Sequence, residues 1–213
     1  PAMAYVHNLG SVSNSGKEGF MMLGYDDIYS IEYMYEKRMG YWKHDGKVTI
    51  FDAFEKLRDN YQAIMERCRA FDELIYDDAE KAGGKKYAEI CSASYRQVIS
   101  AHKLFTDKEG NLLWFSKENN SNGCVNTVDL TYPSAPLFLV YNPELQKAMM
   151  TSIFEYSASG RWNKPFPAHD LGTYPIANGQ VYGGDMPIEE GGNMVILAAA
   201  ISKIEGNADY VKK

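Results

Sequence analysis

Residues 49–84 decide the fold class, and they read TIFDAFEKLRDNYQAIMERCRAFDELIYDDAEKAGG. Apolar side chains recur at helical spacing through most of this stretch, which predicts an amphipathic helix. Thr49 precedes the apolar stripe and Asp52 follows three residues later, an arrangement typical of a helix N-terminus. The glycines at 83 and 84 end the pattern, as glycines do at helix C-termini. The stretch therefore predicts a long helical element that ends at a turn.

The same periodicity continues along the rest of the chain. It predicts helices over about 26–35, 86–104, 125–141, 143–157 and 187–205, with the opening of another at 207–213. Turn residues at 108–111 between short apolar runs predict a small β-hairpin within 107–118. Residues 161–184 form a long irregular segment rich in glycine, proline and aromatic residues. About seven helices joined by turns favour an all-α array of antiparallel helical hairpins.

Length and composition bound the class of protein. The chain has 213 residues, 45% of them hydrophobic and 13% aromatic, which suits one folded domain over 5–213. Residues 1–4 resemble a cloning remnant. The longest apolar run, 195–201, is far shorter than the ~20 residues of a membrane span. The net charge of −6 and the lack of a basic stretch argue against nucleic acid as a partner.

The cysteines and the known motifs predict no metal and no cofactor. Cys68, Cys91 and Cys124 are an odd number without CxxC spacing, so a zinc site or a disulfide framework is not expected. Cys68 and Cys91 lie in helical patterns, where we expect them to be small buried hydrophobic residues. The chain also lacks a P-loop, an HExxH helix and the glycine pattern of a dinucleotide site.

Polar chemistry gathers between Trp162 and Glu190. Loops of this length are uncommon in compact domains unless they are functional. The segment contains His169 and Asp170, and it ends at Glu189 and Glu190 in the first turn of the helix expected at 187–205. One of these glutamates could pair with Asp170 for general acid–base chemistry, or both could simply complement the helix dipole. Because neighbours in sequence seldom point the same way, we expect the partner of His169 to lie elsewhere.

Several motifs resemble the glutaminase A family, in particular its central six-hairpin domain. They occur in order along most of the chain: LGSVS at 9–13, YDDIYSI at 25–31, NTVDLTYP at 126–133, FEY at 154–156, PAHDLGTYP at 167–175 and MPIEEGGNM at 186–194. The resemblance implies an (α/α)6 toroid of the six-hairpin glycosidase type, in a secreted or periplasmic protein. It also implies hydrolysis of L-glutamine to L-glutamate and ammonia.

A full ring of six hairpins needs twelve helices, more than the sequence predicts here. We therefore expect a piece of a larger polypeptide whose remaining domains are its partners. An incomplete ring should leave an apolar edge that favours self-association, and the isolated chain should be inactive.

The first functional hypothesis is an amidohydrolase that acts on a small-molecule amide. It needs an activated water, donors for the oxyanion and an acid for the departing ammonia. The candidate catalytic residues are Asp170, Glu189, Glu190 and His169, with Glu190 or Asp170 as the base. The candidate substrate-binding residues are Asn126, Asp129, Trp162, Tyr174 and Asn193, although Asp129 could instead only complement the dipole of its helix.

The second hypothesis is a carbohydrate-active domain, either a glycoside hydrolase or a sugar-binding module. Glycosidases of this kind place two carboxylates around the scissile bond, ~5–5.5 Å apart for retention and ~6.5–9.5 Å for inversion. Trp162, Tyr174 and Tyr182 could then stack on sugar rings, or they could fill space between helices. The third hypothesis is a purely structural part of the toroid.

Overall fold

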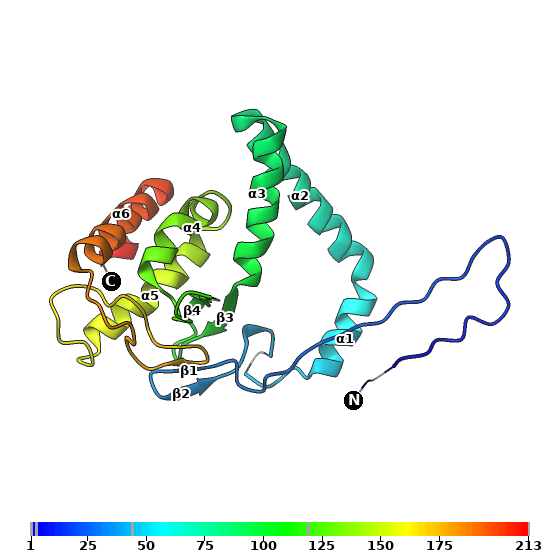
Figure 1. Cartoon of the computed structure of the whole chain (residues 1–213), viewed down its shortest axis with the longest axis horizontal. Coiled ribbons are helices and arrows are strands. Elements are labelled where there is room, and N and C mark those ends of the chain that lie inside the picture. The colour runs from blue at the N-terminus through cyan, green and yellow to red at the C-terminus, as the bar shows by residue number, and fades with distance from the viewer. Residues whose placement is uncertain (1, 3, 44, 119, 213) are drawn as a thin grey trace.

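The protein is mostly helical, with two small sheets (Figure 1). The computed structural model describes residues 2, 4–43, 45–118 and 120–212, so Pro1 and Met3 of the expected remnant and Lys213 lie outside the described residues. Within these ranges six α-helices occur: α1 Ile50–Asp59, α2 Tyr61–Gly83, α3 Lys85–Ser100, α4 Val128–Tyr141, α5 Pro143–Ala158 and α6 Pro187–Glu205. The strands are β1 Ile31–Tyr33, β2 Glu36–Arg38, β3 His102–Thr106, β4 Leu112–Ser116 and β5 Ile176–Ala177. Two 3-10 helices, η1 Tyr41–Lys43 and η2 Tyr210–Lys212, complete the order, and η2 stands where the sequence predicts a further helix.

The helix predicted after residue 49 is present but is divided in two. Thr49 and Asp52 form a capping box: the Asp52 amide donates to Thr49 Oγ1 at 3.2 Å, and the Thr49 amide donates to Asp52 Oδ2 at 2.8 Å. At Asn60 the backbone leaves helical geometry, with φ −112° and ψ 10°, and α2 then continues to Gly83. Gly84 adopts φ 79° between α2 and α3, so the glycine turn joins two helices into a hairpin.

The helix predicted over 26–35 is wrong, because this segment contains strand β1 and the turn to β2, with which β1 pairs in antiparallel fashion. Met34 and Tyr35 connect the strands with φ of 49° and 68°, the left-handed backbone that two-residue hairpin turns require. β5, from much later in the chain, pairs in parallel with β1 and gives the strand order β2-β1-β5.

The small hairpin predicted around residues 107–118 is confirmed as β3–β4. β3 begins at His102, so the preceding helix, predicted to reach residue 104, ends at Ser100. The helices predicted at 143–157 and 187–205 correspond closely to α5 and α6. The helix predicted from 125 starts three residues later, because residues 124–126 instead bond to a distant loop and to β4.

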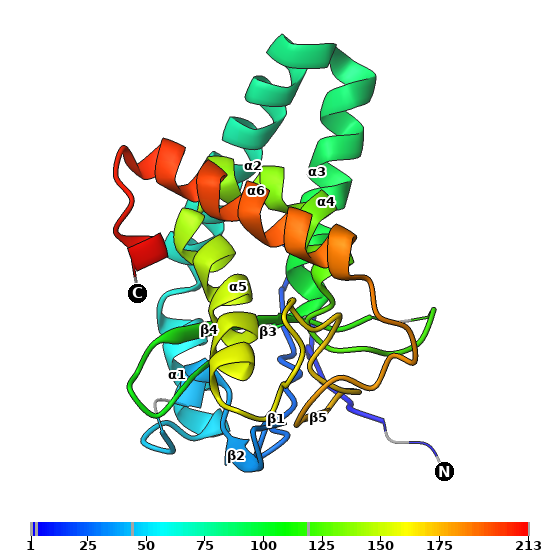
Figure 2. The same ribbon diagram turned by 90° about the vertical axis from the view of Figure 1, so that its left-hand side faces the viewer.

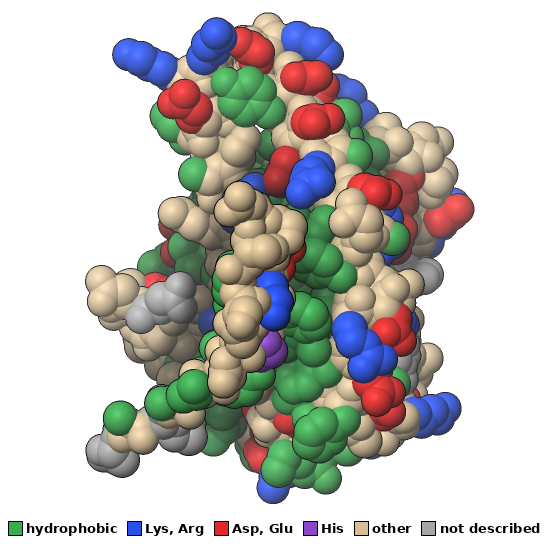
Figure 3. Space-filling model, turned by 90° about the vertical axis from the view of Figure 1, so that its right-hand side faces the viewer, with side chains coloured by type: hydrophobic (Ala, Val, Ile, Leu, Met, Phe, Trp, Pro, Cys, Tyr) green, Lys and Arg blue, Asp and Glu red, His purple; other side chains and the backbone are tan. Residues whose placement is uncertain are grey.

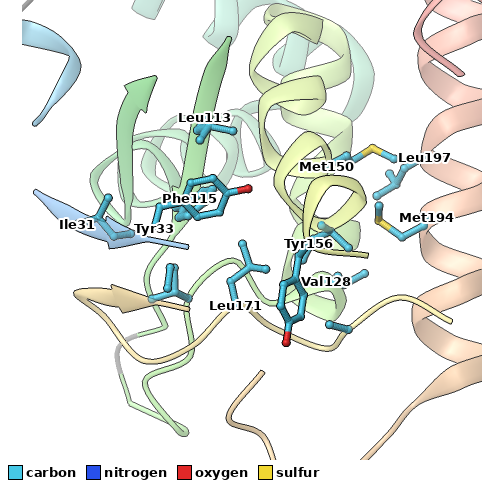
Figure 4. Packing of buried hydrophobic residues seen from close by; sticks show 14 of the residues in the cluster. Ile31, Tyr33, Leu113, Phe115, Val128, Met150, Tyr156, Leu171, Met194 and Leu197 are labelled. Atoms are coloured by element: carbon cyan, nitrogen blue, oxygen red, sulfur yellow. The ribbon is translucent and has the colours of Figure 1, made fainter. Parts of the chain in front are cut away.

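The main core lies between the sheets and helices α4, α5 and α6 (Figure 4). Tyr33 of β1 meets Phe115 of β4 edge-on, with ring centroids 5.4 Å apart. On the other side of α5, Met150 faces Met194 and Leu197 of α6. Seen from the end in Figure 2, α6 crosses in front of α4, and the loop before α6 runs below them. This packing fixes where α4 and α6 begin.

Helices α1, α2 and α3 stand apart from this core and leave apolar surface exposed. Phe51 is 74% exposed and Ile90 64% exposed, and hydrophobic side chains gather on the face shown in Figure 3. Cys68 of α2 is exposed and Cys91 of α3 is partly exposed, so the prediction that both are buried is wrong. The helical stripe was correctly recognised, but no element of the described chain covers much of it. None of the described helices is long and apolar enough to cross a membrane.

Candidate functional site at the start of helices α4 and α6

Two helix N-termini and one loop bring the polar candidates together. Asp129 lies in the first turn of α4, and Glu190 lies in the first turn of α6. His169 and Asp170 belong to the loop between α5 and α6. One ligand-type atom from each of Asp129, His169 and Glu190 lies within 4.8 Å of the others. The loop and the two helix starts, which are distant in sequence, thus form one cluster.

Backbone hydrogen bonds hold the loop against the start of α4. The Val125 amide donates to the Gly172 carbonyl at 2.8 Å, and the Leu171 amide donates back to the Val125 carbonyl at 3.0 Å. The Val128 amide donates to the His169 carbonyl at 2.9 Å. Gly172 has φ 140°, and a Cβ there would collide with the Ile176 carbonyl oxygen. The backbone around His169 is therefore fixed by a short stretch of strand-like pairing between distant segments and by a glycine at which a side chain would clash.

Asp170 is fully buried and both of its carboxylate oxygens are engaged. Oδ1 accepts from the amides of Gly172 at 2.9 Å and Val181 at 3.0 Å. Oδ2 accepts from the Tyr182 amide at 3.1 Å and lies 2.9 Å from Nδ1 of His169. The expectation that the partner of His169 lies elsewhere is wrong, because the loop bends so that both side chains point to the same side. With four hydrogen bonds, Asp170 is suited to positioning and not to abstracting a proton.

His169 is 3% exposed and is held on two sides. An ionised carboxylate only accepts hydrogen bonds, so the bond to Asp170 places the proton on Nδ1. The ring stacks on Tyr182, with centroids 4.1 Å apart and planes 17° apart. Nε2 is left as an electron-pair donor and lies 3.8 Å from Oδ2 of Asp129. A fixed imidazole with one available nitrogen can accept a proton or bind a cation.

Glu190 is fully buried, and neither carboxylate oxygen has a hydrogen-bond partner in the described part of the chain. Burial, together with the negative charges of Asp129, Glu189 and Asp170, raises the pKa of this carboxyl to about 8. The side chain of Asp129 is 30% exposed, and its Oδ1 also lacks a partner among the described residues. Asp129 therefore lies between solvent and Glu190, a buried acid without a hydrogen-bond partner among the described residues.

The other predicted site residues have different surroundings. Asn126 is fully buried, and its amide donates to the Met149 carbonyl and to Ser152 Oγ, both at 2.8 Å. These bonds tie α5 to the start of α4 and leave no amide hydrogen for a substrate. Asn193 lies on α6 one turn beyond Glu190 and is largely buried.

The remaining three predicted residues are Trp162, Tyr174 and Glu189. Trp162 packs on the core, and its Nε1 donates to the Phe166 carbonyl. Tyr174 also packs on the core and lies under the Lys117 ammonium, 5.2 Å from its ring centroid. Glu189 is exposed, although its charge acts on Glu190.

Sequence reasoning did not place Cys124 beside Asp170. Cys124, His169 and Asp170 form a second compact group of ligand-type side chains. Burial, together with the negative charge of Asp170, raises the pKa of the Cys124 thiol to about 12, so the thiol stays protonated. No spacing in the sequence marks this neighbour, because the bridge between Cys124 and Thr173 that aligns the segments spans nearly 50 residues.

Fold and site together define a helical-hairpin protein with a buried carboxylate–histidine cluster at converging helix starts. Comparison with known proteins narrows this class. Residues 84–213 match the glutaminase A six helical-hairpin domain, and residues 1–78 match a domain of unknown function (DUF5127). The chain belongs to the glutaminase A family, and the whole cluster lies in the six-hairpin region.

Two curated relatives carry a glutaminase name. "Glutaminase A" of Aspergillus oryzae is 35% identical over 221 residues, which cover 100% of this chain and 32% of the relative. "Probable glutaminase/05536" of Arthroderma benhamiae is 36% identical over 127 residues, 58% of this chain and 15% of the relative. The chain thus spans about a third or less of the length of these relatives. No solved structure matches it.

Proposed function

We propose that this chain supplies part of the active site of a glutaminase A-like hydrolase, which converts L-glutamine and water to L-glutamate and ammonia. Membership of the family and the names of the two relatives support the reaction class. The observation that carries the proposal is the orientation of His169: Asp170 holds Nδ1, and Nε2 lies 3.8 Å from Oδ2 of Asp129, with the unpartnered Glu190 in the same cluster. We therefore place the attacking water at this cluster as part of the proposal.

The cluster contains the groups that water activation requires. Nε2 of His169 and the carboxylate of Asp129 can take the proton of a water between them, and the Asp170 carboxylate stabilises the imidazolium that forms. Asp129 is the member that solvent reaches, so we place the substrate amide on its side. Because Asp170 is saturated by hydrogen bonds, we assign the base to the Asp129–His169 pair and give Asp170 a positioning role.

A point-variant series in the longest natural protein that carries these residues tests the proposal. Asp129→Asn and His169→Ala should each lower glutamine turnover by at least ~10²-fold. Glu73→Gln, an exposed acid on α2, is the matched control and should change nothing. Turnover that survives both site variants would refute the assignment, whereas turnover of asparagine but not glutamine would correct only the substrate.

One observation favours a glycosidase as the second candidate. The carboxylate pair predicted from Asp170 is not available, but oxygens of Asp129 and Glu190 lie within 4.8 Å of each other. This upper limit lies below the ~5–5.5 Å of retaining enzymes and well below the ~6.5–9.5 Å of inverting ones, so of the two mechanisms it favours retention. A panel of aryl glycosides, assayed beside glutamine, decides between the candidates. Hydrolysis of a glycoside with net retention, lost in Asp129→Asn, would replace the amidase proposal.

We also propose that these hairpins are an arc of an (α/α)6 toroid completed by helices outside this sequence. The exposed apolar surface of α2 and α3 supports this proposal, since such surface is normally covered. The isolated chain should then self-associate and lack turnover. If sedimentation equilibrium shows a monomer at high concentration, the proposal that this apolar surface is left uncovered in the isolated chain is contradicted.

A further inference from the structure

We propose that Asp129, His169 and Glu190 bind a first-row divalent transition metal such as Zn²⁺ or Mn²⁺. The inference concerns the site of the proposed function but goes beyond it, because binding can be measured without turnover. Imidazole nitrogen with carboxylate oxygen is a donor set that such cations accept. The cysteine spacings and motifs of the sequence do not indicate this site.

The distances suit a single cation. The three ligand atoms lie within 4.8 Å of one another, and Nε2 of His169 is 3.8 Å from Oδ2 of Asp129. Metal–ligand bonds of about 2.0–2.2 Å place neighbouring ligands of a tetrahedral cation about 3.3–3.6 Å apart. The 3.8 Å between Nε2 and Oδ2 is close to this range, and separations of up to 4.8 Å need to close by at most about 1.5 Å. Rotamer changes of Asp129 and Glu190, which lie in the first turns of α4 and α6, can supply this movement.

Unpartnered oxygens provide an independent reason for a ligand here. Both oxygens of Glu190 are buried without a hydrogen-bond partner, and Oδ1 of Asp129 is likewise unpaired among the described residues. In the same part of the chain, neither carboxylate forms an ion pair with a lysine or an arginine. A buried carboxylate without a partner is costly, and a cation at the cluster would supply a positive partner for the carboxylates of both Glu190 and Asp129.

The surroundings of His169 are those of a metal ligand. Metal-binding histidines commonly donate the other ring N–H to a carboxylate, which fixes the ring and makes the free nitrogen a better donor. Asp170 does this here, and three backbone amides hold Asp170 in turn. Tyr182 covers the face of the ring.

The neighbouring group of Cys124, His169 and Asp170 is a weaker candidate. Nδ1 of His169 and Oδ2 of Asp170 face each other at 2.9 Å, so both atoms are already used. The Cys124 thiol lies against the Asp170 carboxylate and contributes no free thiolate. The atoms that remain free to act as metal ligands therefore lie on the Asp129 side of His169. Three protein ligands leave a fourth position for water, the pattern of catalytic zinc sites.

Calorimetric titration of the chelator-treated chain tests the inference directly. ZnCl₂ and MnCl₂ are titrated separately, with MgCl₂ and CaCl₂ as further arms, and Co²⁺ supplies a visible spectrum that reports the ligand field. We expect one Zn²⁺ or Mn²⁺ per chain and a rise in Tm on binding. Glu190→Gln and His169→Ala should each weaken binding by at least about 100-fold, while His7→Ala and Cys68→Ser should leave it unchanged.

Each alternative result has a defined meaning. The inference is overturned if the folded wild-type chain binds neither Zn²⁺ nor Mn²⁺, or if Glu190→Gln and His169→Ala bind the metal as tightly as the wild type does. Far-UV circular dichroism checks that each variant is folded. Preference for Mg²⁺ or Ca²⁺ would overturn the choice of cation. Turnover is measured in the longest natural protein that carries these residues, because the isolated chain is expected to be inactive. There, glutamine turnover that persists without metal but is lost in Asp129→Asn would retain the proposed function and reject its metal. Stoichiometric metal binding without glutamine turnover in that longer protein would do the reverse.

Discussion

Replacing Asp170 with asparagine should reverse the tautomer of His169. The substitution keeps the shape of the side chain but leaves one acceptor oxygen where there were two. If that oxygen stays on the amides of Gly172 and Val181, the new NH₂ group faces Nδ1 of His169 and the Tyr182 amide. Both of these groups donate to the wild-type carboxylate, so two donors would confront two donors.

The size of the effect follows from this count. A hydrogen bond to a charged group contributes roughly 1.5–3 kcal/mol, so two lost bonds would cost roughly 3–6 kcal/mol. Moving the imidazole proton to Nε2 lets Nδ1 accept from the new NH₂ group, which recovers one bond and leaves a cost of roughly 1.5–3 kcal/mol. The variant should adopt this cheaper state. Nε2 would then carry a hydrogen and could neither bind a cation nor take a proton from water.

Urea unfolding and ¹⁵N chemical shifts of the imidazole measure the two consequences separately. Asp185→Asn is the matched control, since Asp185 lies in the same loop but forms an exposed pair with Lys164. The control should lose at most about 1 kcal/mol. The reasoning is refuted if Asp170→Asn matches the control in stability and keeps the proton on Nδ1. Loss of stability without a change of tautomer would contradict the assigned hydrogen-bond direction.

Three further predictions concern other parts of the chain. Burial lowers the pKa of His102 from 6.5 to about 4, so the unfolded chain takes up a proton before the folded chain does as pH falls. The free energy of unfolding should therefore drop between pH 6.5 and 4, by roughly 2 kcal/mol at pH 5, and His102→Phe should abolish this dependence in urea unfolding. Gly172→Ala should lower the unfolding free energy by roughly 2 kcal/mol or more, measured by denaturant, because of the positive φ and the clash with the Ile176 carbonyl. Thr49→Ala should cost about 1 kcal/mol in the same assay through loss of the capping box, and an unchanged midpoint would reject that contribution.

Periodicity predicted long elements well and short ones badly. α5 and α6 were found because each repeats its apolar pattern over at least four turns and begins at a proline. β1 and β2 have three residues each, so apolar residues at 28, 31, 34 and 35 imitate a helix. Their true structure depends on the left-handed turn at Met34 and on pairing with β5, which lies more than 140 residues away. Neither cause is visible in a local window.

The identity of the site residues was predictable to a similar degree. Local sequence marked His169, Asp170 and Glu190 as polar residues at a loop and a helix start. It could not separate Glu189 from Glu190, which lie about 100° apart on a helix, so that one faces solvent and the other the core. It also could not show that Asp170 would turn back onto His169, since that turn is imposed by amides at 172, 181 and 182.

The distribution of hydrogen bonds distinguishes the two buried acids more sharply than their position does. Asp170 has four partners and stabilises the loop, so its burial needs no further explanation. Glu190 has none among the described residues, and its burial beside Asp129 lowers the stability of the fold. A glutamine or methionine would occupy that space at less cost. A carboxylate retained there against stability is expected where a ligand or a reaction uses it, and Glu190 is for this reason central to the proposed metal site.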